Sequence, residues 1–400
     1  MTLSVLTEKI RNGGYDSRFA ELYDSVDRAR ERALVLCREF EKRFGDREGA
    51  ELFSSPARVE LLGNHTDHAG GRALAAAIKE DIMALAAPDK ERVALYGEKE
   101  VDLILDGKER HEDEQRTSAA FARGMAERFG GGFVGVTNSR IPLGGGLASS
   151  AAYALLCAKI ADEFHSETKA DPMRLALIAA DIERYCYGKS CGMLDQIAIS
   201  YGGTSYISFN TLIPIVKQLN LSFGDYLLYI VNTGETHANK SVLYKGIVDD
   251  MTVAANFFGC NMLGQVPPEE FKERGEVLKK RHGERIYRRA LHFFDENKRV
   301  DFFVRMAGAG KTDLALYSIN GSGISSRSNL GNVHLRAVEA TTALKDVAAG
   351  IRIHGGGFGG AMLCFVKPAN KTDFEKINSE LFGAASLIPV SLRSAGVCKL

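Results

Sequence analysis

Hydrophobic residues recur at a helical period in the opening part of the chain. From about residue 16 to residue 44 they are spaced three or four apart among dense charges, with Phe19, Leu22 and Val26 as examples. This spacing predicts a helix. From residue 52 to about 105 the pattern changes to short β-like runs separated by Gly, Pro and Asp, and these predict strands. The runs are ARVELLG, IMALAA, RVALYG and VDLIL.

The rest of the chain alternates between the two patterns. Helices are predicted at about 117–129, 147–164 and 171–187 and over most of 240–345. Strands are predicted in GGFVGVTNS, GTSYISF, YLLYIVNT, GIRIHGG, AMLCFVK and near ASLIPVSL. Strands flanked by helices on both sides of residue 220 favour an α+β fold. Because 400 residues exceed one comfortable core, we expect two domains, 1–220 and 221–400.

The bulk composition excludes several classes of partner. Lys+Arg and Asp+Glu are equal at 51 each, so there is no excess of positive charge to hold a nucleic acid. The longest apolar runs, such as ALAAAI at 73–78, are far shorter than a membrane span, and the N-terminus has no signal-peptide pattern. Seven cysteines without paired or zinc-ligand spacing indicate reduced, mostly buried thiols. We therefore expect a cytoplasmic protein with no nucleic-acid or membrane partner.

Two Gly-Lys pairs look like the end of a phosphate-binding P-loop. That loop also needs a glycine five residues before the pair. The residue in that place is Arg305 for Gly310-Lys311-Thr312 and Glu183 for Gly188-Lys189-Ser190. Both pairs are therefore interpreted as turns or helix ends.

A further glycine run, HGGGFGG at 354–360, contains the spacing GxGxxG. A dinucleotide-binding fold needs a helix after these glycines, so that the helix N-terminus faces the pyrophosphate. The residues that follow, AMLCFV, form a strand pattern instead, and the dinucleotide interpretation fails. The run is either a β-hairpin turn or a segment whose backbone closely approaches a ligand or another loop.

The strongest candidate for a phosphate site is PLGGGLASSA at 142–151. A predicted strand precedes its glycines, and an Ala/Leu-rich helix follows them. The three glycines let successive N–H groups converge, and the helix N-terminus adds about half a positive charge at the same point. Ser149 and Ser150 stand in the first turn, where hydroxyls can touch phosphate or a metal. A plain strand-turn-helix explains the glycines but not the serine pair, so the segment predicts an anion site.

Three segments together resemble the three motifs of the GHMP kinases, which include galactokinase, homoserine, mevalonate and phosphomevalonate kinases. Residues 56–67 (PARVELLGNHTD) are similar to the galactokinase signature for the sugar site, 142–152 to the phosphate loop and 355–360 to the third motif. CGMLDQ at 191–196 resembles the catalytic segment, and 232–244 a galactokinase stretch that ends in a sugar-contacting tyrosine. Within the family, the likeness is closest to the galactokinase branch.

The resemblance, which runs from about residue 50 to residue 365, implies a two-domain α+β GHMP kinase fold. The N-terminal domain would be like domain 2 of ribosomal protein S5, the C-terminal domain would be ferredoxin-like, and the active site would lie in the cleft between them. The implied reaction is transfer of the γ-phosphoryl group of ATP to a sugar hydroxyl with Mg²⁺ as cofactor, giving galactose 1-phosphate from galactose. The partners would be the sugar and ATP, and the protein would be a monomer or a weak homodimer.

The resemblance also implies the site residues, position by position. Asp195 matches the residue that receives the hydroxyl proton, and Arg58 matches the arginine that acts with it. The implied ATP-binding residues are Gly144, Gly145, Gly146, Leu147, Ser149 and Ser150. The implied metal ligands are Ser149, or Ser150 in its place, and Glu183. The implied sugar contacts are Asn64, His65, Asp67, Gly192 and Tyr244.

Each of these residues also has a plainer interpretation. Asp195 could be a cap beside a turn, and Arg58 a solvated residue of an edge strand. Glu183 could lie on the surface and Tyr244 in the core. The sequence does not decide whether Asp195 acts as a true base or as a positioning charge.

Two positions depart from the galactokinase signature. Asn64 stands where the signature has glutamate, and His68 where it has tyrosine. An amide in place of a carboxylate facing a sugar hydroxyl loses about 1 kcal/mol, but an amide can also donate. The alternative is therefore a GHMP kinase for a related sugar, such as an amino sugar, a uronic acid, arabinose or fucose. A sugar sensor without turnover is disfavoured, because Ser149-Ser150-Ala151 is complete.

Overall fold

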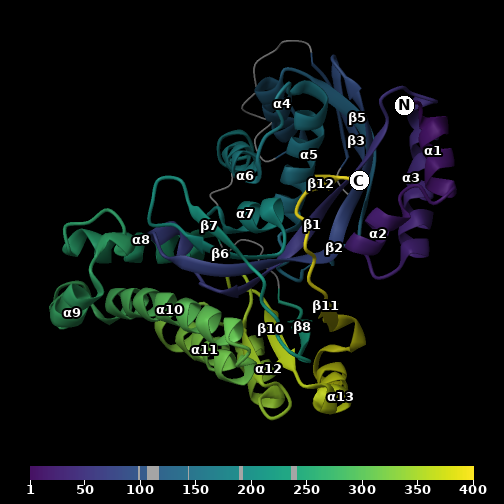
Figure 1. Ribbon diagram of the computed structural model, residues 1–400. Coiled ribbons are helices and arrows are strands. Elements are labelled where there is room, and N and C mark those ends of the chain that lie inside the picture. The colour runs from purple at the N-terminus through teal and green to yellow at the C-terminus, as the bar shows by residue number, and fades with distance from the viewer. Residues whose placement is uncertain (98–99, 106–116, 143, 189–191, 236–240) are drawn as a thin grey trace.

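The computed structural model describes residues 1–97, 100–105, 117–142, 144–188, 192–235 and 241–400 of the chain. Two β-sheets organise these residues, one in the upper and one in the lower half of Figure 1. Helices cover both sheets, so the α+β class predicted from the sequence is confirmed.

The first sheet has eight described strands in the order β12-β1-β2-β5-β3-β4, with β6 and β7 added beside β2. Its central strand β2 pairs with β1 along one edge, and on the other edge with β6 through residues 72–76 and with β5 through residues 82–89. The strands are β1 (Glu51–Leu62), β2 (Arg72–Asp89), β3 (Arg92–Tyr96), β4 (Val101–Ile104), β5 (Gly132–Ser139), β6 (Thr204–Ser208), β7 (Ile215–Leu219) and β12 (Cys398–Lys399).

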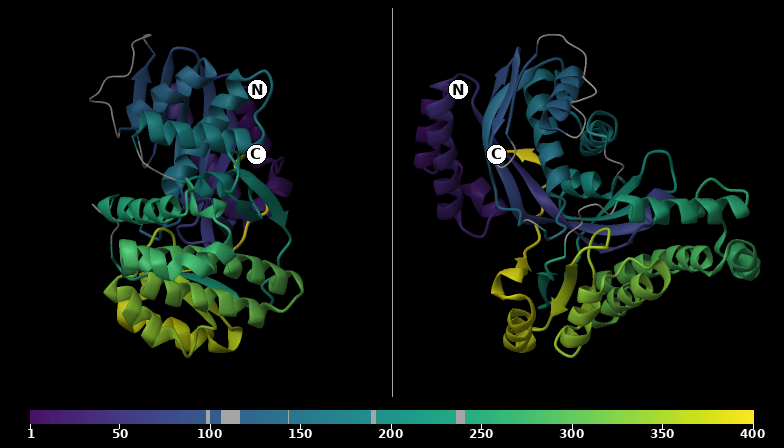
Figure 2. Two further views of the ribbon diagram at one scale, coloured as in Figure 1. Left: turned by 90° about the vertical axis from the view of Figure 1, so that its left-hand side faces the viewer. Right: turned by 180° about the vertical axis from the view of Figure 1, so that it is seen from behind.

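Both faces of the central strands β1 and β2 are largely buried, which explains their nearly continuous hydrophobic runs. Leu52 packs with the N-terminal helices, whereas the next residue, Phe53, packs with the helices on the other face. Figure 2 shows these layers from two further sides. The first face is covered by α1 (Leu3–Arg11), α2 (Asp16–Leu22) and α3 (Val26–Phe44), and the other by α4 (Ser118–Phe129), α5 (Ser149–His165), α6 (Pro172–Asp181) and α7 (Leu194–Tyr201).

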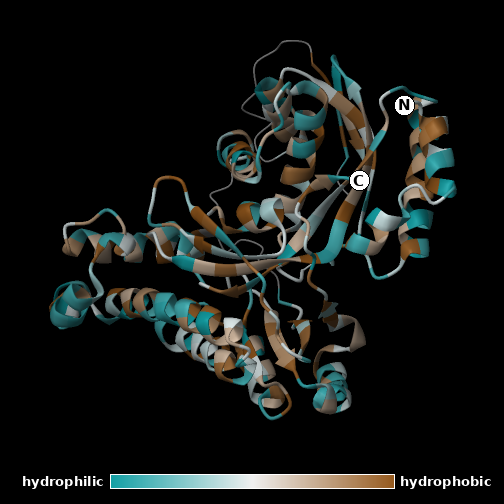
Figure 3. Cartoon of the chain, in the orientation of Figure 1, coloured by the Kyte–Doolittle hydropathy of each residue, from teal (hydrophilic) through white to brown (hydrophobic). Residues whose placement is uncertain are grey.

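The second sheet is antiparallel, in the order β11-β8-β10-β9. Every residue of β10 is buried, and the strand is hydrophobic along its length in Figure 3. The strands are β8 (Leu227–Asn232), β9 (Gly350–Ile353), β10 (Ala361–Val366) and β11 (Leu387–Val390). The helices that contact this sheet are α11 (Thr312–Ser325), α12 (Leu335–Leu344) and α13 (Lys371–Phe382). Helices α8 (Ser241–Phe257), α9 (Pro268–His282) and α10 (Glu284–Gly308) pack with one another, and α10 also contacts β1 and β2 of the first sheet.

The single helix predicted over residues 16–44 is wrong in one respect, because the structure divides it into α2 and α3. Tyr23 adopts an extended conformation between them, and its hydroxyl donates to Asp81 over 2.7 Å. Ser25 then caps α3 by accepting from Arg28 N at 3.3 Å. A buried tertiary hydrogen bond and a new cap therefore outweigh the continuous helical period.

Asp81 is a fully buried carboxylate on β2. Burial alone would raise its pKa, but the guanidinium groups of Arg32, at 2.5 Å, and Arg393, at 3.5 Å, lower the pKa below its ordinary value. This ion cluster ties α3 and the C-terminal segment to the first sheet.

The neighbouring Glu80 has no such cation within ion-pair distance in the described part of the chain. Its Oε2 is buried without a hydrogen-bond partner there, and burial, with the charges of Asp24 and Asp81, raises its pKa to about 7. The folded state thus keeps a proton that the unfolded state has released, so stability falls as pH rises from about 4.5 to about 7. We expect Glu80→Gln to raise the free energy of unfolding by up to about 3 kcal/mol at pH 8.

Urea unfolding at pH 4.5 and pH 8 checks this expectation. The two proteins should differ by less than about 0.5 kcal/mol at the lower pH, where folded Glu80 is protonated and unfolded Glu80 is about half protonated. The exposed Glu91 serves as the control, since Glu91→Gln should change neither value. Equal stability of wild type and Glu80→Gln at pH 8 would contradict the buried, unpaired carboxylate.

The C-terminal end of the chain crosses back to the first sheet. Strand pairing passes from the first sheet to the second between Leu219 and Leu227, near the expected boundary at residue 220. After β11, however, the chain returns, and β12 pairs with β1 at Phe53 and Ser54. The last residues thus pack with the N-terminal half, while the division into 1–220 and 221–400 stays a prediction.

The remaining bulk predictions concern thiols and membranes. No disulfide joins the six cysteines that the structure describes, and four of them are buried, as the sequence predicted. Their reduced state stays a prediction. Among the described helices, none combines the length and apolar character that a membrane crossing requires.

Candidate active site

The phosphate-loop candidate lies between β5 and the N-terminus of α5. Gly144 and Gly146 have φ angles of 76° and 64°, left-handed values that favour glycine. The helix begins at Ser149, whose side chain is exposed, while Ser150 is half-buried. The N–H groups of the first turn have no partners within a helix, so this end of α5 can accept an anion.

The same loop packs against the second sheet. A Cβ atom on Gly145 would lie 3.1 Å from Ile388 Cδ1, and one on Gly146 would lie 3.4 Å from Ala361 Cβ and from His354 Nδ1. A side chain at Gly145 would crowd Ile388 on β11, and the positive φ of Gly146 favours glycine there. The glycines therefore allow the loop to lie where the two sheets meet.

Arg58 on β1 connects the loop to Asp195. Its Nε donates to Asp195 Oδ1 at 2.7 Å, its Nη2 lies 2.6 Å from the same oxygen, and its Nη1 donates to Gly146 O at 2.6 Å. The Arg58 side chain is 6% exposed and that of Asp195 is 32% exposed. A buried cation thus holds a partly accessible carboxylate beside the glycine loop, and neither residue is the solvated edge arginine or simple cap of the plainer interpretation.

Asp67 lies next to Gly192 in the predicted catalytic segment. A Cβ atom on Gly192 would lie only 1.6 Å from Asp67 Oδ2, so the carboxylate occupies the space that the glycine leaves. Burial raises the pKa of Asp67, and the nearby charge of Asp195 adds to this, against the lowering effect of His65. Two carboxyl groups therefore face one small region of the site.

His65 and Tyr244 pack on the third motif. His65 Nε2 donates to Gly356 O at 2.7 Å, and its ring stacks on Tyr244 with centroids 5.9 Å apart. The Tyr244 hydroxyl donates to Gly357 O at 2.9 Å, and burial raises its pKa to about 12. Both side chains are half-buried. Both side chains therefore lie beside the glycine run at 355–360. Their contact with a sugar stays a prediction.

The prediction that Asn64 faces a sugar hydroxyl is contradicted by the structure. Asn64 is 0% exposed. Its Nδ2 donates to Glu60 Oε1 at 3.1 Å and to Gly355 O at 2.5 Å, and its Oδ1 accepts from Asn332 Nδ2 at 2.7 Å. The amide is used to fasten the sugar motif to the third motif. The amide thus binds protein groups at the position where the resemblance to the galactokinase signature implied a sugar.

We expect Asn64→Ala to destabilise the fold by about 2–4 kcal/mol, because three buried partners lose their hydrogen bonds. Thermal unfolding monitored by circular dichroism measures this loss. Asn210, an exposed residue after β6, provides the control, and Asn210→Ala should leave Tm nearly unchanged. An Asn64→Ala protein as stable as wild type would show that the three hydrogen bonds contribute nothing.

The implied metal ligands present oxygen donors, which suit Mg²⁺. Glu183 is 3% exposed, lies in a π-helical extension of α6 (Ile182–Cys186), and accepts from Gln196 Nε2. Gln196 follows Asp195 directly, so the carboxylate is oriented from the catalytic segment. Ser149 stays accessible at the loop. Among the described residues, no group of three or more His, Cys, Asp or Glu side chains forms a metal site, and a donor set of one hydroxyl and one carboxylate would leave room for phosphate oxygens.

The structure adds buried residues that sequence reasoning missed. Arg352 on β9 is 0% exposed; its Nη2 donates to Glu60 Oε1 at 2.7 Å and its Nη1 to Leu61 O at 2.8 Å. On α10, Glu296 accepts from Gly63 N at 3.1 Å, which fixes the backbone of the predicted sugar motif (residues 56–67) at that point. The sequence did contain one signal for Arg352, which is a charged residue inside the apolar strand GIRI. A charge in such a strand is buried only together with a partner.

The sequence analysis rejected two P-loop interpretations and one dinucleotide-binding interpretation, and the described residues agree with these rejections. Gly310 and Thr312 lie at the turn from α10 to α11. Residues 354–360 connect β9 to β10 as a hairpin, with no helix after the glycines. Of the Gly188-Lys189-Ser190 pair, Lys189 and Ser190 lie outside the described residues, as do Leu143 and Cys191 of the other motifs.

Comparison with known proteins gives matches along most of the chain. The family model described as "Galactokinase galactose-binding signature" matches residues 38–88, and the one described as "GHMP kinases N terminal domain" matches 117–203. The galactokinase of Lactococcus lactis subsp. cremoris (strain MG1363) is 26% identical over 385 residues, covering 91% of this chain and 94% of the relative.

Solved structures agree with this similarity. The crystal structure of Lactococcus lactis galactokinase complexed with galactose has a TM-score of 0.81 and 26% identity, covering 91% of this chain and 98% of that one. The Methanococcus jannaschii mevalonate kinase, with a TM-score of 0.62 and 16% identity, covers 86% of this chain and 99% of its own, and shares the fold. The similarity includes the segments that carry the predicted sugar and phosphate motifs.

Proposed function

We propose that this chain, which is a galactokinase-like kinase with the GHMP kinase fold, transfers the γ-phosphoryl group of ATP to the anomeric hydroxyl of galactose. One observation carries the proposal. Arg58 hydrogen-bonds both Asp195 and the backbone of Gly146, so a carboxylate able to receive a proton lies beside a loop able to hold phosphates. Such closeness is what in-line phosphoryl transfer requires, because the reaction depends mainly on positioning and charge.

In this mechanism the glycine loop and the N-terminus of α5 bind the phosphates. Backbone N–H groups and the helix dipole favour the negative charge there, and the Ser149 and Ser150 hydroxyls add donors. Asp195 receives the proton from the sugar hydroxyl or orients that hydroxyl. Arg58 fixes the carboxylate, and its positive charge offsets charge that develops on the transferring group.

Mg²⁺ is the metal that we propose for the site. Ser149 and Glu183 would hold it, and it would neutralise charge on the phosphate oxygens. Gln196 orients the Glu183 carboxylate for this task.

Galactose is proposed as the sugar because the sugar motif keeps its charged contact. Asp67 can accept from two neighbouring hydroxyls, and Gly192 leaves the space in which that carboxylate lies. The case for another sugar rested on an Asn64 amide facing the substrate. Since that amide is buried among protein partners, it gives no reason to prefer an amino sugar or a uronic acid.

A panel of sugars with ATP and Mg²⁺ tests the proposal. Release of ADP is measured for galactose, galactosamine, galacturonic acid, arabinose and fucose, and kcat/KM is compared. Galactose is expected to give the largest value. If a different sugar gave a far larger kcat/KM, the proposed kinase reaction would stand, but galactose would be the wrong substrate. No sugar-dependent ADP release at all would favour the sensor without turnover.

A further inference from the structure

A second cavity lies away from the candidate active site, between α11 and α12 over the edge strand β9. Its volume is about 550 Å³, within the range of small-molecule sites. None of its lining residues is a predicted catalytic, phosphate or sugar residue. In Figure 1 the two helices lie in the lower half of the molecule.

The floor of this cavity is apolar. It includes Ile351, Ile353 and Met362 from the second sheet, and Ile324 and Val338 from the two helices. Ile324 is 69% exposed although it sits on this wall. A large exposed side chain beside a hollow is stabilised when an apolar group covers it.

The backbone polar groups of the edge strand β9 are partly hydrogen-bonded, so they do not make this side of the cavity polar. Asn320 on α11 accepts from Ile351 N at 3.0 Å and donates to Ala349 O at 2.9 Å. Gly323 brings α11 close, since a Cβ atom there would lie 2.8 Å from Ile351 O. The polar groups that an edge strand normally presents to solvent are thus partly used.

The rim of the cavity is positively charged. Arg327 and Lys345 line it, and in the described part of the chain neither makes an ion pair or a hydrogen bond through its side chain. Lys367 also lines it and is partly engaged, by Asp313 at 3.7 Å and by the Tyr226 ring, whose centroid is 5.6 Å away. Asp346 is the single acidic residue on the rim. The surplus of cations over an apolar floor complements a ligand with an anionic head and an apolar body.

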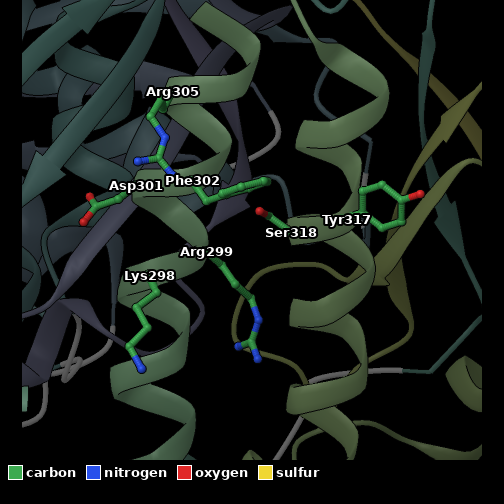
Figure 4. A pocket seen from close by; sticks show the side chains of 7 residues that line it. All are labelled: Lys298, Arg299, Asp301, Phe302, Arg305, Tyr317 and Ser318. Atoms are coloured by element: carbon green, nitrogen blue, oxygen red, sulfur yellow. The ribbon is translucent and has the colours of Figure 1, made fainter.

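We propose that this cavity binds a small amphipathic anion, with a carboxylate or phosphate at the rim lined by Arg327, Lys345 and Lys367 and an apolar portion against Ile324 and Val338. The hollow between α10 and α11 (Figure 4) suits such a ligand less well. Two of the cations that line it are already paired, Arg299 with Glu296 at 3.0 Å and Lys298 with Asp295 at 3.3 Å.

Two connections link the cavity wall to the candidate active site. Val333 lines the cavity, and the preceding Asn332 donates to Gly356 O at 3.2 Å and to Asn64 Oδ1 at 2.7 Å. From β9, Arg352 reaches the sugar-motif strand at Glu60. Occupancy of the cavity therefore bears on the third motif and on the sugar motif, and we expect it to change KM for galactose. This second consequence rests on the proposed function.

Isothermal titration with octanoate tests the binding site independently of activity. Wild type should bind one octanoate per chain, more weakly at high salt, while n-octanol and octylamine should bind much less. The double substitution Arg327→Gln and Lys345→Gln should weaken octanoate binding about tenfold, and Val338→Phe should weaken it by filling the cavity. The matched control, Lys298→Gln with Arg305→Gln in the hollow of Figure 4, should bind as wild type does.

The outcomes separate the two proposals. Absence of saturable octanoate binding, or equal binding by the Arg327/Lys345 double variant, overturns the cavity proposal whatever the enzyme does. Equal binding of n-octanol overturns the role of the cationic rim. If octanoate binds as expected but KM for galactose does not change, the coupling is wrong. If no sugar is phosphorylated, the proposed function fails and the binding site stands.

Discussion

Replacing Asp195 by asparagine is expected to lower kcat about a thousandfold, within the range that general acid–base groups contribute. The asparagine oxygen can still accept from Arg58, so the loop and the fold should be preserved, but the side chain can no longer receive the hydroxyl proton. KM for ATP and for galactose should change little. Coupled measurement of ADP release at saturating substrates gives the value.

Asp249→Asn is the matched control for this substitution. That carboxylate is exposed on α8 and pairs only with Lys245 in the described part of the chain, so its loss should leave kcat unchanged. An Asp195→Asn enzyme that retains more than about a tenth of wild-type kcat would remove the carboxylate from the chemical step.

Replacing Arg58 by lysine is expected to lower kcat about a hundredfold, because one ammonium group cannot hold Asp195 and Gly146 O in the same geometry. The positive charge is kept, so the change isolates the loss of the guanidinium fork. Since Arg58 contacts the phosphate loop, KM for ATP should also rise. Steady-state kinetics with ATP and galactose varied separately distinguishes the two effects.

Arg72→Lys supplies a comparison for the arginine. Arg72 lies at the start of β2 and pairs with Asp301 at the surface, where an exposed ion pair contributes little. It should behave like wild type. If Arg58→Lys and Arg72→Lys gave equal kinetics, the bridge between the carboxylate and the loop would have no part in turnover.

The sequence predicted the local elements well because they depend on local properties. The period of apolar residues predicted the helices, and short runs between Gly, Pro and Asp predicted the strands. The helix after the glycines at 144–146 and the strand after HGGGFGG were predicted correctly, since helical and strand patterns are encoded in consecutive residues. Phosphate binding by these glycines stays a prediction. The order and spacing of the motifs also carried the kinase resemblance that the comparisons support.

Failures occurred where a local signal competed with a distant contact. The helical period continued through Tyr23, but the hydrogen bond of its hydroxyl to Asp81, 58 residues away, favours an extended conformation there. The motif placed Asn64 at a sugar position, but Asn332, 268 residues away, takes its oxygen. Neither partner is adjacent in sequence, so no spacing rule pointed to it.

By itself, the amino-acid sequence determined most of the helices, strands and glycine loops, though not β7, β12 or the break at Tyr23, and it determined which residue types stand in each motif. Only the tertiary structure decided which of these residues meet. Arg58 joins Asp195 and Gly146 from 137 and 88 positions away, and the cavity between α11 and α12 exists because of how two helices pack on one strand. Local preference arises from neighbouring residues, whereas burial and pairing depend on side chains that come together only when the whole chain packs.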